Sequence, residues 1–282
     1  MIPKKLLIIL ISGLLMTTLT SSKSIAGGEK ETKVAINTTM GKIVVKLYNE
    51  TPKTRDNFIK LVNQKFYDST LFHRVIQTFM IQGGDPASKK ATSGVMLGNG
   101  GVGYTVPAEF VPGFFHKKGA LATARQGDEI NPGKASSGCQ FYIVQGKVFS
   151  NEELDQYELN MNRGIKQKVF TDIISKPQYA TQKQKFIDYQ NQNNIDSLRA
   201  LSQKFEPLID SAYAKLPHFQ FTPEQRKIYT TVGGAPHLDG NYTVFGEVVE
   251  GLDIVDKIAA VQVDGNSRPL QDVRILSMEI VK

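Results

Sequence analysis

Residues 71–86 read Leu-Phe-His-Arg-Val-Ile-Gln-Thr-Phe-Met-Ile-Gln-Gly-Gly-Asp-Pro, an apolar stretch that contains one arginine and closes in a turn-forming sequence. Its pattern predicts one strand over residues 71–75 and a second over 79–82. Because the side chains of a strand alternate between its two faces, a cation, an amide and two apolar side chains can turn toward one groove. These side chains are Arg74, Phe79, Met80 and Gln82. A groove of this composition suits a small apolar ring flanked by peptide carbonyls.

Strand-like segments recur on both sides of this stretch. The predicted strands are 32–37, 42–47, 121–124, 140–144, 242–248 and 273–281. One helix is expected to begin with Thr51 as its N-cap and Pro52 at its first position, and another covers 252–260. Residues 87–119 are rich in Gly, Ser, Thr and Pro, which predicts long loops over a closed sheet.

The composition changes after residue 146. Residues 147–232 contain few glycines, are rich in Lys, Gln and Asn, and place apolar residues at helical spacing. Two stripes result, one of Leu154, Tyr157, Met161, Ile165, Val169 and Ile173, the other of Ile195, Leu198, Leu201, Phe205, Leu208 and Ala212. Ser150 with Glu153 and Thr222 with Gln225 fit capping boxes. The sequence therefore predicts an α-helical subdomain inserted into a β domain of residues 27–146 and 233–282.

Residues 1–26 have the organisation of a secretory signal peptide. Lys4 and Lys5 precede an apolar run over 6–16, and small and polar residues follow as far as Ala26. The run is too short for a comfortable membrane span, although an uncleaved anchor is the alternative interpretation. We expect export to a periplasm or to the medium, with no stable membrane span after cleavage.

Charge and cysteine content narrow the choice of partners. The chain carries a formal net charge of +7, and removal of residues 1–26 leaves 31 basic against 27 acidic residues, a net charge of +4. No dense Lys/Arg stripe interleaved with aromatic residues is present, so nucleic acid is not expected as a partner. Cys139 is the only cysteine, which rules out an intramolecular disulfide. We interpret it as a small buried apolar residue rather than a reactive thiol.

Common catalytic and metal motifs are missing from the sequence. It contains no Cys-x-x-Cys, His-Glu-x-x-His, Walker glycine loop or nucleophile elbow, and its four histidines lack metal-ligand spacing. The glycine-rich segment 94–103 is not followed by Gly-Lys-Ser/Thr, so a surface loop is a better interpretation than a phosphate loop. His73 is expected on the opposite face of its strand from Arg74, in a packing or hydrogen-bonding role.

Three blocks of sequence occur in a fixed order. They are Phe-His-Arg-Val-Ile at 72–76 with Phe-Met-Ile-Gln-Gly-Gly-Asp at 79–85, Ser-Ser-Gly-Cys-Gln-Phe-Tyr-Ile at 136–143, and Leu-Asp-Gly at 238–240 with Val-Phe-Gly at 244–246. In these blocks the chain resembles the cyclophilin family of peptidyl-prolyl cis/trans isomerases. The similarity covers about 34–145 and 234–281, while the signal peptide and the helical insert lie outside it.

The resemblance implies an eight-stranded closed antiparallel β-barrel capped by two helices, with the substrate groove on its outer wall. It also implies residue roles: Arg74 for catalysis; Phe79, Met80, Tyr142 and Leu238 for the proline pocket; Gln82 and Gln140 for the peptide backbone; Ala124 and Arg125 for the residue before proline. Two positions depart from the common pattern. His237 stands where many members carry tryptophan, and Tyr242 stands where histidine is frequent. Tyr242 keeps an aromatic ring and a hydrogen-bond donor, so isomerase activity is still expected. The two departures affect mainly the expected affinity for inhibitors of the family.

Elementary chemistry agrees with an arginine in this role. The rotation barrier of about 18–20 kcal/mol comes from amide resonance, which requires the lone pair of the prolyl nitrogen. At the twisted transition state that lone pair is localised and accepts a hydrogen bond better, so a guanidinium stabilises the twisted state more than either planar isomer. Acceleration by about 10⁵ requires only about 7 kcal/mol. No covalent intermediate, metal or cofactor is expected.

Two functions from different classes follow from the sequence. The first is an exported isomerase that acts on X-Pro bonds of proline-containing polypeptides and assists their folding. The alternative is a proline-peptide-binding chaperone or docking module whose helical insert provides the main surface for a protein partner. The insert enters the chain directly before His237 and Leu238, which motivates the alternative.

Overall fold

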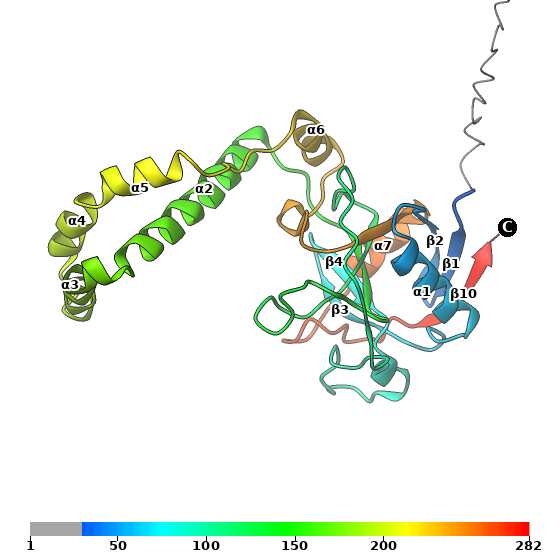
Figure 1. Ribbon diagram of the computed structural model, residues 1–282. Coiled ribbons are helices and arrows are strands. Elements are labelled where there is room, and N and C mark those ends of the chain that lie inside the picture. Colours follow the sequence, from blue (N-terminus) through cyan, green and yellow to red (C-terminus); the bar gives the residue numbers. More distant parts are fainter. Residues whose placement is uncertain (1–29, 282) are drawn as a thin grey trace, which may run out of the picture. The chain divides into compact units, whose positions relative to one another are not determined.

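The computed structural model describes residues 30–281, so the predicted signal peptide lies outside the described residues. This part of the chain is mainly β and contains an eight-stranded antiparallel sheet in the order β10-β1-β2-β9-β6-β8-β4-β3 (Figure 1), and a two-stranded sheet of β5 and β7. The strands are β1 Lys33–Thr38, β2 Gly41–Leu47, β3 Phe72–Ile76, β4 Met80–Gly83, β5 Thr105–Val106, β6 Ala120–Thr123, β7 Ser136–Ser137, β8 Phe141–Val144, β9 Val244–Glu250 and β10 Ile275–Val281.

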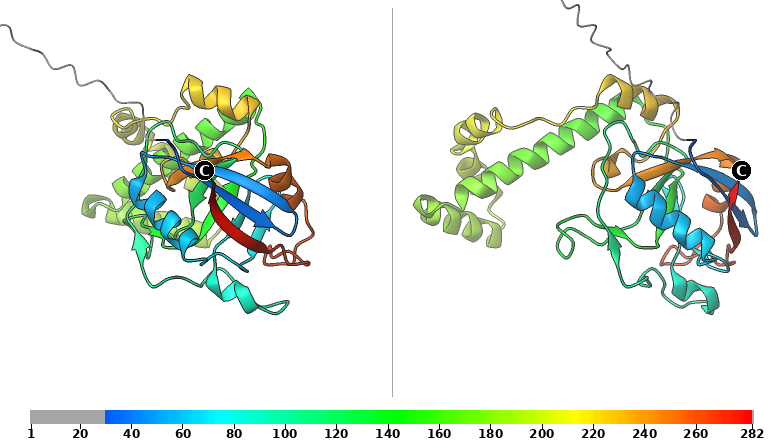
Figure 2. Two further views of the ribbon diagram at one scale, coloured as in Figure 1. Left: turned by 90° about the vertical axis from the view of Figure 1, so that its right-hand side faces the viewer. Right: turned by 45° about the vertical axis from the view of Figure 1, so that its right-hand side comes forward.

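The eight-stranded sheet is curled, so that its outer strands β3 and β10 approach each other (Figure 2). An isolated bridge pairs Leu71 with Arg274, and the Phe72 amide donates to the Val273 carbonyl at 2.9 Å. These contacts lie at the very start of the two strands, and no ladder between β3 and β10 is formed within residues 30–281. The sheet is therefore a curled antiparallel sheet, and its complete closure into a barrel stays a prediction.

Two helices pack against this sheet. α1 (Pro52–Asn63) buries Phe58 and Leu61, and α7 (Leu252–Ala259) buries Val255 and Ile258, in the main hydrophobic core with the inward side chains of the strands. Full burial of each such side chain contributes about 1.5–3 kcal/mol. Three short 3₁₀ helices, η1 (Pro86–Lys90), η2 (Pro177–Tyr179) and η3 (Pro236–Leu238), complete the described elements together with the helices of the insert.

The N-terminus of α1 differs from the sequence prediction. Pro52 occupies the first turn as expected, but Thr51 makes no side-chain cap, and its hydroxyl donates to the Tyr48 carbonyl at 3.4 Å. The carboxylate of Glu109 accepts the Lys53 amide at 3.1 Å and the Thr54 amide at 2.9 Å. A negative group suits the positive end of a helix, so a distant loop supplies the cap that Thr51 was expected to provide.

The insert is helical, as its composition predicts. It contains α2 (Asn151–Ile174), α3 (Ala180–Asn191), α4 (Ile195–Gln203), α5 (Glu206–Tyr213) and α6 (Pro223–Thr231). Both predicted capping boxes are present, at the start of α2 and of α6. The two ends of the insert meet, because the Gly234 amide donates to the Lys147 carbonyl at 2.9 Å. A Cβ at Gly146 would approach the backbone of Gly234 to 2.3 Å, so this junction requires glycine.

The apolar stripes of the insert do not form one continuous core. Leu154 packs with Phe221 and Tyr229 in one cluster, whereas Val169 and Ile173 belong to a second cluster with Leu201 and Phe205. Met161, between them on the stripe, is 42% exposed.

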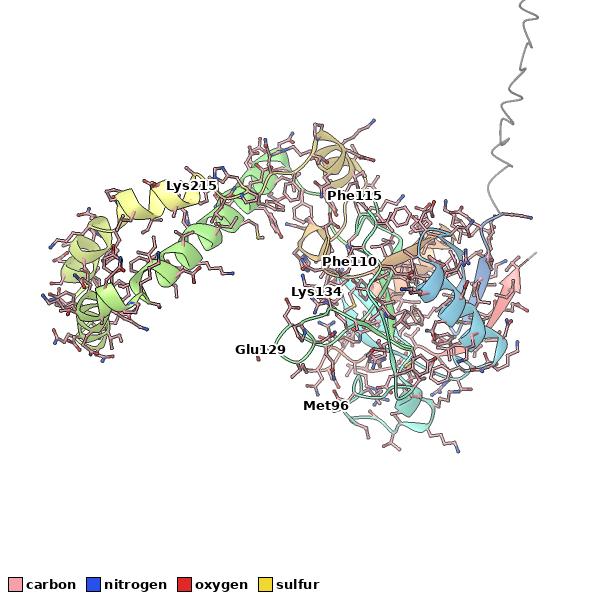
Figure 3. The ribbon with its side chains drawn as sticks, viewed as in Figure 1. Met96, Phe110, Phe115, Glu129, Lys134 and Lys215 are labelled. Atoms are coloured by element: carbon pink, nitrogen blue, oxygen red, sulfur yellow. The ribbon has the colours of Figure 1, made fainter. Side chains whose placement is uncertain are left out.

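The second predicted stripe is also broken. α4 ends at Gln203 and α5 begins at Glu206, with Pro207 in its first turn. Pro207 has no N–H to donate to the carbonyl of Gln203, four residues earlier, so one continuous helix through this point is interrupted. Long loops carry Met96, between η1 and β5, and Glu129 and Lys134, between β6 and β7 (Figure 3).

Candidate active site

Strand register places three polar and aromatic side chains in one row. Arg74 of β3 pairs with Gln82 of β4, Gln82 pairs with Tyr142 of β8, and Tyr142 pairs with Ala122 of β6. Directly paired residues of neighbouring strands share a face of the sheet. The cation, the amide and the phenol therefore stand side by side on the outer face.

The neighbouring row faces the opposite way. Val75, Ile81, Ile143 and Leu121 are paired in the same sequence of strands, and all four lie in the main core. Because a shift of register by one residue exchanges the faces of a strand, the burial of these four side chains holds Arg74 on the outer face.

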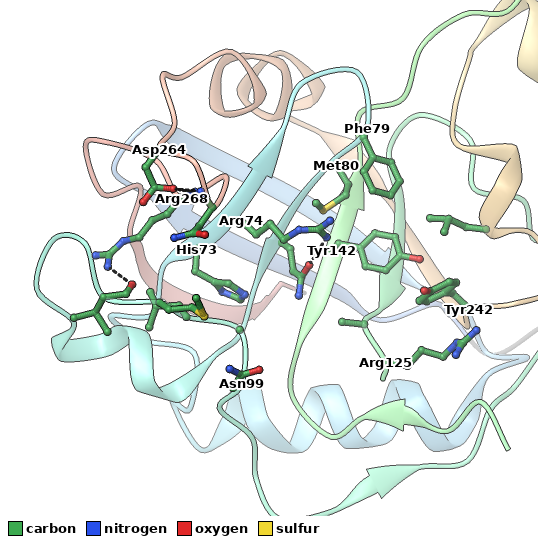
Figure 4. Close-up of a pocket in the computed structure, with 18 of the residues that line it drawn as sticks. His73, Arg74, Phe79, Met80, Asn99, Arg125, Tyr142, Tyr242, Asp264 and Arg268 are labelled. Carbon is green, nitrogen blue, oxygen red and sulfur yellow. Dashed lines mark hydrogen bonds between the residues drawn. The ribbon is translucent and has the colours of Figure 1, made fainter. Parts of the chain in front are cut away.

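A groove of about 480 Å³ opens over the outer row (Figure 4). Nine of the ten predicted site residues line it: Arg74, Phe79, Met80, Gln82, Ala124, Arg125, Tyr142, Leu238 and Tyr242. The tenth, Gln140, does not. Five segments of the chain supply these residues: β3, β4 with the turn before it, β8, the loop after β6, and η3 with the loop that precedes β9. The structure thus brings together the residues that the sequence pointed to.

A chain of hydrogen bonds holds Arg74 and explains the position of Gln140. The guanidinium Nη1 of Arg74 donates to Gln82 Oε1 at 3.1 Å, and Gln82 Nε2 donates to Gln140 Oε1 at 3.0 Å. Gln140 Nε2 then donates to the carbonyls of Gly98 and Gly100, both at 2.8 Å. The amide group of Gln140 is bonded within the protein, and its side chain lines an adjoining cavity of about 600 Å³ that shares Gln82, Ala124 and Arg125 with the groove.

The floor of the groove is apolar. Met80, Tyr142 and Leu238 are buried in a hydrophobic cluster on the outer face, and Phe79 packs against it. His237 lies over Phe79, with 5.1 Å between the ring centroids. A concave apolar floor beside a few aligned polar groups is the usual composition of a small-ligand site.

Arg125 and Tyr242 form one wall. The Arg125 guanidinium lies 4.5 Å from the centroid of the Tyr242 ring. Its Nε donates to the Asn241 carbonyl at 2.7 Å and its Nη1 to the Asp128 carboxylate at 2.6 Å. These bonds and the cation–π contact fix the orientation of the Tyr242 ring.

A buried polar network lies behind the floor. The Tyr142 hydroxyl is 3.0 Å from His116 Nε2, and His116 Nδ1 is 3.0 Å from Asp239 Oδ1. Because a carboxylate only accepts, Nδ1 carries the proton and Nε2 accepts from Tyr142. Tyr229 of α6 donates its hydroxyl to Asp239 Oδ2 at 2.6 Å. The network therefore connects the insert to the floor of the groove.

Burial determines the protonation of this network. It lowers the pKa of His116, although the bond to Asp239 acts in the opposite direction. It also raises the pKa of the Tyr142 hydroxyl well above its ordinary value. His116 is therefore neutral and Tyr142 protonated around neutral pH, as the hydrogen bonds require.

Several groove residues were not among the predicted site residues. His73 was expected on the opposite face from Arg74, but it lines the same groove beside Gly98, where the register of β3 and β4 shifts between Phe72 and Arg74. It is buried, and neither of its ring nitrogens has a hydrogen-bond partner within residues 30–281. Met96 and Asn99 also line it, from a loop that sequence analysis left without a role. His116 has no motif around it, so no local signal pointed to its place in the network.

Other chemistry is less favoured at this site. Among residues 30–281, no group of three or more His, Cys, Asp or Glu side chains is arranged to hold a metal ion. The Cys139 thiol is buried, and this burial raises its pKa to about 11, which keeps it protonated. In the described part of the chain, no helix has the length and apolar character needed to cross a membrane.

Comparison with known proteins agrees with the geometry. The family described as cyclophilin type peptidyl-prolyl cis-trans isomerase/CLD matches residues 33–196 and 223–280. A putative peptidyl-prolyl cis-trans isomerase of Staphylococcus aureus (strain COL) is 30% identical over 251 residues, covering 89% of this chain and 92% of its own. One of Staphylococcus haemolyticus (strain JCSC1435) is 29% identical over 254 residues, covering 89% and 92%.

Solved structures show the same fold. A cyclophilin type peptidyl-prolyl cis-trans isomerase of Cryptosporidium parvum has a TM-score of 0.52 at 18% identity, covering 90% of this chain and 99% of its own. The same protein in the presence of the dipeptide Ala-Pro gives a TM-score of 0.51. The family match and the relatives together establish that the chain belongs to the cyclophilin-type peptidyl-prolyl cis-trans isomerases.

Proposed function

We propose that Arg74 carries the isomerase activity by donating a hydrogen bond to the prolyl nitrogen of an X-Pro bond in its twisted transition state. The observation that supports this most is the row of Arg74, Gln82 and Tyr142 across three paired strands, directly over an apolar floor. A proline ring on that floor brings its nitrogen to the edge where the guanidinium stands. The resemblance to the family is independent support for the same assignment.

The hydrogen bonds of Arg74 suit this role. A guanidinium has five N–H donors, and the bond to Gln82 uses one of them. That bond limits rotation of the side chain before substrate arrives, so little entropy is lost when the second bond forms. The charge is already oriented toward the position where the lone pair develops, which is the requirement for electrostatic stabilisation of a transition state.

The other predicted residues take binding roles in the proposal. Phe79, Met80, Tyr142 and Leu238 hold the proline ring, and Ala124, Arg125 and Tyr242 contact the chain on its other side. Gln82 holds the peptide backbone through its remaining amide proton. Since the polar atoms of Gln140 are bonded to Gln82, Gly98 and Gly100, we propose that Gln140 positions Gln82 instead of binding peptide directly.

The test of Arg74 is turnover of a short proline tetrapeptide by the mature chain. Arg74→Ala is expected to lower kcat/KM by at least about tenfold, because one charge-assisted bond contributes about 1.5–3 kcal/mol. Arg163→Ala, on the exposed surface of α2, is the matched control. Retained turnover in a folded Arg74→Ala protein would remove this residue from the mechanism.

Export and a role in folding are part of the proposal. Residues 1–26 have the composition of a signal peptide, and slow X-Pro isomerisation limits the folding of exported chains. Mass spectrometry of the protein from its native cells is expected to find an N-terminus close to residue 27 in the exported fraction. An intact Met1 in the cytosolic fraction would contradict this.

A second candidate function is the binding of polypeptides by the insert. Exposed Met161 and Leu216 line an apolar groove of about 590 Å³ along α2, which favours a surface for unfolded chains. Replacing residues 151–231 by a short linker is feasible since Lys147 and Gly234 are hydrogen-bonded neighbours. Unchanged suppression of aggregation by this variant would exclude the insert as a chaperone surface.

Complete closure of the sheet is the last part of the proposal. The bonds from Phe72 to Val273 and from the Ile275 amide to the Thr70 carbonyl, at 2.9 and 2.8 Å, support it. Both amides are then expected to exchange with solvent as slowly as those of central strands.

A further inference from the structure

A second cleft shares Tyr242 with the proline groove. It has a volume of about 350 Å³ and is formed jointly by the sheet domain and the insert. Phe110 and Phe115, labelled in Figure 3, line it from the loop before β6, and Phe219 lines it from the segment before α6. Phe110 is 41% exposed, which is high for an aromatic side chain without a partner surface.

The insert side of this cleft is preformed. The side chain of Asn162 accepts the Phe219 amide at 2.8 Å and donates to the Phe219 carbonyl at 2.9 Å. The Phe219 ring also packs on Tyr157 and Phe221, with centroids 5.7 and 5.0 Å apart. Because both backbone groups and the ring of Phe219 are held, a ligand in the cleft does not have to order this wall.

The cleft is also held beside the proline groove. Gln225 and Tyr229 of α6 donate to Asp239 Oδ2 at 3.2 and 2.6 Å. Asp239 directly follows Leu238, which forms the floor of the proline groove. One residue of the sheet domain thus anchors α6 next to the wall that the two sites share.

The lining predicts the chemistry of the occupant. Asp239 is the one charged residue among those that line the cleft. Its Oδ1 accepts the amide and the ring Nδ1 of His116, and its Oδ2 accepts Gln225 and Tyr229. With the carboxylate already bonded to four donors and the remaining walls mostly apolar, the cleft suits an apolar side chain.

We propose that this cleft binds an apolar side chain of the same polypeptide whose proline occupies the groove, so that the enzyme prefers unfolded chains over short peptides. The proposal rests on the proposed function of the groove. A substrate chain that leaves the groove past Tyr242 enters the cleft. Binding of its apolar side chain there is then intramolecular, which raises the affinity of the enzyme for the whole substrate without changing the proline site. Folded proteins bury such side chains, so the cleft selects unfolded substrates.

The test uses synthetic peptides with one Ala-Pro bond in a Ser/Gly background. A single leucine is moved through the positions outside the four residues that a tetrapeptide substrate covers, on either side of the proline. The parent protein is expected to bind peptides with leucine at one position, or two adjacent ones, about fivefold to tenfold more tightly, as partial burial of a leucine side chain predicts. Isothermal titration gives the Kd values.

Two variants of the cleft locate the effect. Phe110→Ala and Phe219→Ala are each expected to abolish the leucine gain while tetrapeptide kcat/KM stays at the parent value. Phe110 is partly exposed, so its replacement leaves folding intact even if Phe219→Ala loosens the insert. Leu159→Ala, which removes a 60% exposed apolar side chain of α2 outside the cleft, is the matched control and is expected to keep the gain.

The possible outcomes separate the two proposals. If the parent turns over the tetrapeptide but shows no position-dependent gain, or if the gain survives Phe110→Ala, the cleft proposal is wrong and the proposed function stands. If the tetrapeptide is not turned over, the proposed function fails first. A concentration-dependent dimer that Phe110→Ala abolishes would assign the cleft to a second copy of the chain and would also overturn the proposal.

Discussion

The sheet domain and the helical insert are stabilised in different ways. The sheet domain has one main core, to which all eight strands of the large sheet and both α1 and α7 contribute, and a second cluster on the outer face. The insert has two small clusters, one around Leu154 and one around Phe170, and exposes Met161 between them. A continuous core unfolds as a unit, whereas small separate clusters open locally. The row of Arg74, Gln82 and Tyr142 therefore lies on the region with the continuous core, and the region that we expect to open locally is the insert.

The largest effect is expected from a pair of substitutions that tests the difference between the two regions, one in the core of the sheet domain and one in a cluster of the insert. Phe58 of α1 is 3% exposed and its ring centroid is 5.1 Å from that of Tyr67 and 5.2 Å from that of Phe245. Phe58→Ala is expected to lower the free energy of global unfolding by about 3–5 kcal/mol. Phe170→Ala, in the far cluster of the insert, is expected to increase amide exchange around it and leave tetrapeptide turnover unchanged. Urea unfolding, hydrogen exchange and tetrapeptide turnover are measured for both variants. Equal losses of turnover in the two variants would contradict the proposed difference between the sheet domain and the insert.

Asp239→Asn tests the link between the two regions. The carboxylate accepts four donors, two from His116 and one each from Gln225 and Tyr229. An asparagine has one oxygen, and its amide group would face donors, so we expect a loss of about 2–3 kcal/mol. Asp210→Asn, on an exposed carboxylate of α5, is the control. Hydrogen exchange should show loss of protection in α6, and unchanged protection would show that Asp239 does not anchor it.

Acidification is expected to weaken the sheet domain through its buried histidines. Burial lowers the pKa of His73, His116 and His237 in the folded protein. The unfolded chain therefore binds more protons than the folded one below about pH 6.5, the ordinary value for histidine. Above about pH 6.5 the three neutral histidines contribute fully to the stability of the folded protein. This contribution is lost as the pH falls below about 6.5 toward the lowered pKa values of the folded state. Urea unfolding across this range measures the effect, and a stability that rises on acidification would contradict it.

The smallest effect is expected on the surface of the insert. Lys166 of α2 and Asp210 of α5 form an ion pair at 2.8 Å, with side chains 46% and 64% exposed. Lys166→Ala is expected to leave stability almost unchanged, because solvent screens the pair. Lys183→Ala on α3 is the control, and thermal unfolding at low and high salt measures both. A clear loss of stability in Lys166→Ala alone would show that the pair, rather than the two clusters, holds α2 and α5 together.

Local patterns predicted the strands of the large sheet, but not β5 and β7, which have two residues each. The predicted strand 42–47 corresponds to β2, and the predicted strand 273–281 to β10, because each carries apolar side chains that lie in the main core. The cap of α1 could not be predicted in this way. Glu109 lies 55 positions from Thr54, and only the folded chain brings its carboxylate to the helix.

Part of the candidate site could also be predicted from local sequence, and part of it only the folded chain brings together. The groove residues were predictable because they cluster in motifs that also resemble a known family. The network behind the floor was not, since His116 lies outside the motif blocks and is 123 positions from Asp239, whose own block, Leu-Asp-Gly, does not point to it. Gln140 itself lies in a motif, but the partners of its amide could not be predicted, because the carbonyls of Gly98 and Gly100 come from a loop without regular structure.

The joined ends of the insert have a consequence for how the chain can change. Lys147 and Gly234 are hydrogen-bonded to each other, so the insert is a loop whose two ends are closed at the surface of the sheet domain. The entropic cost of closing such a loop grows only logarithmically, by about 0.6 kcal/mol for each doubling of its length. Helices between α2 and α6 can therefore be gained or lost with little effect on the stability of the sheet domain, provided that Gly146 and Gly234 keep the two backbones in contact and that α6 keeps its bonds to Asp239. The length of the insert can then change without altering the face that carries the groove.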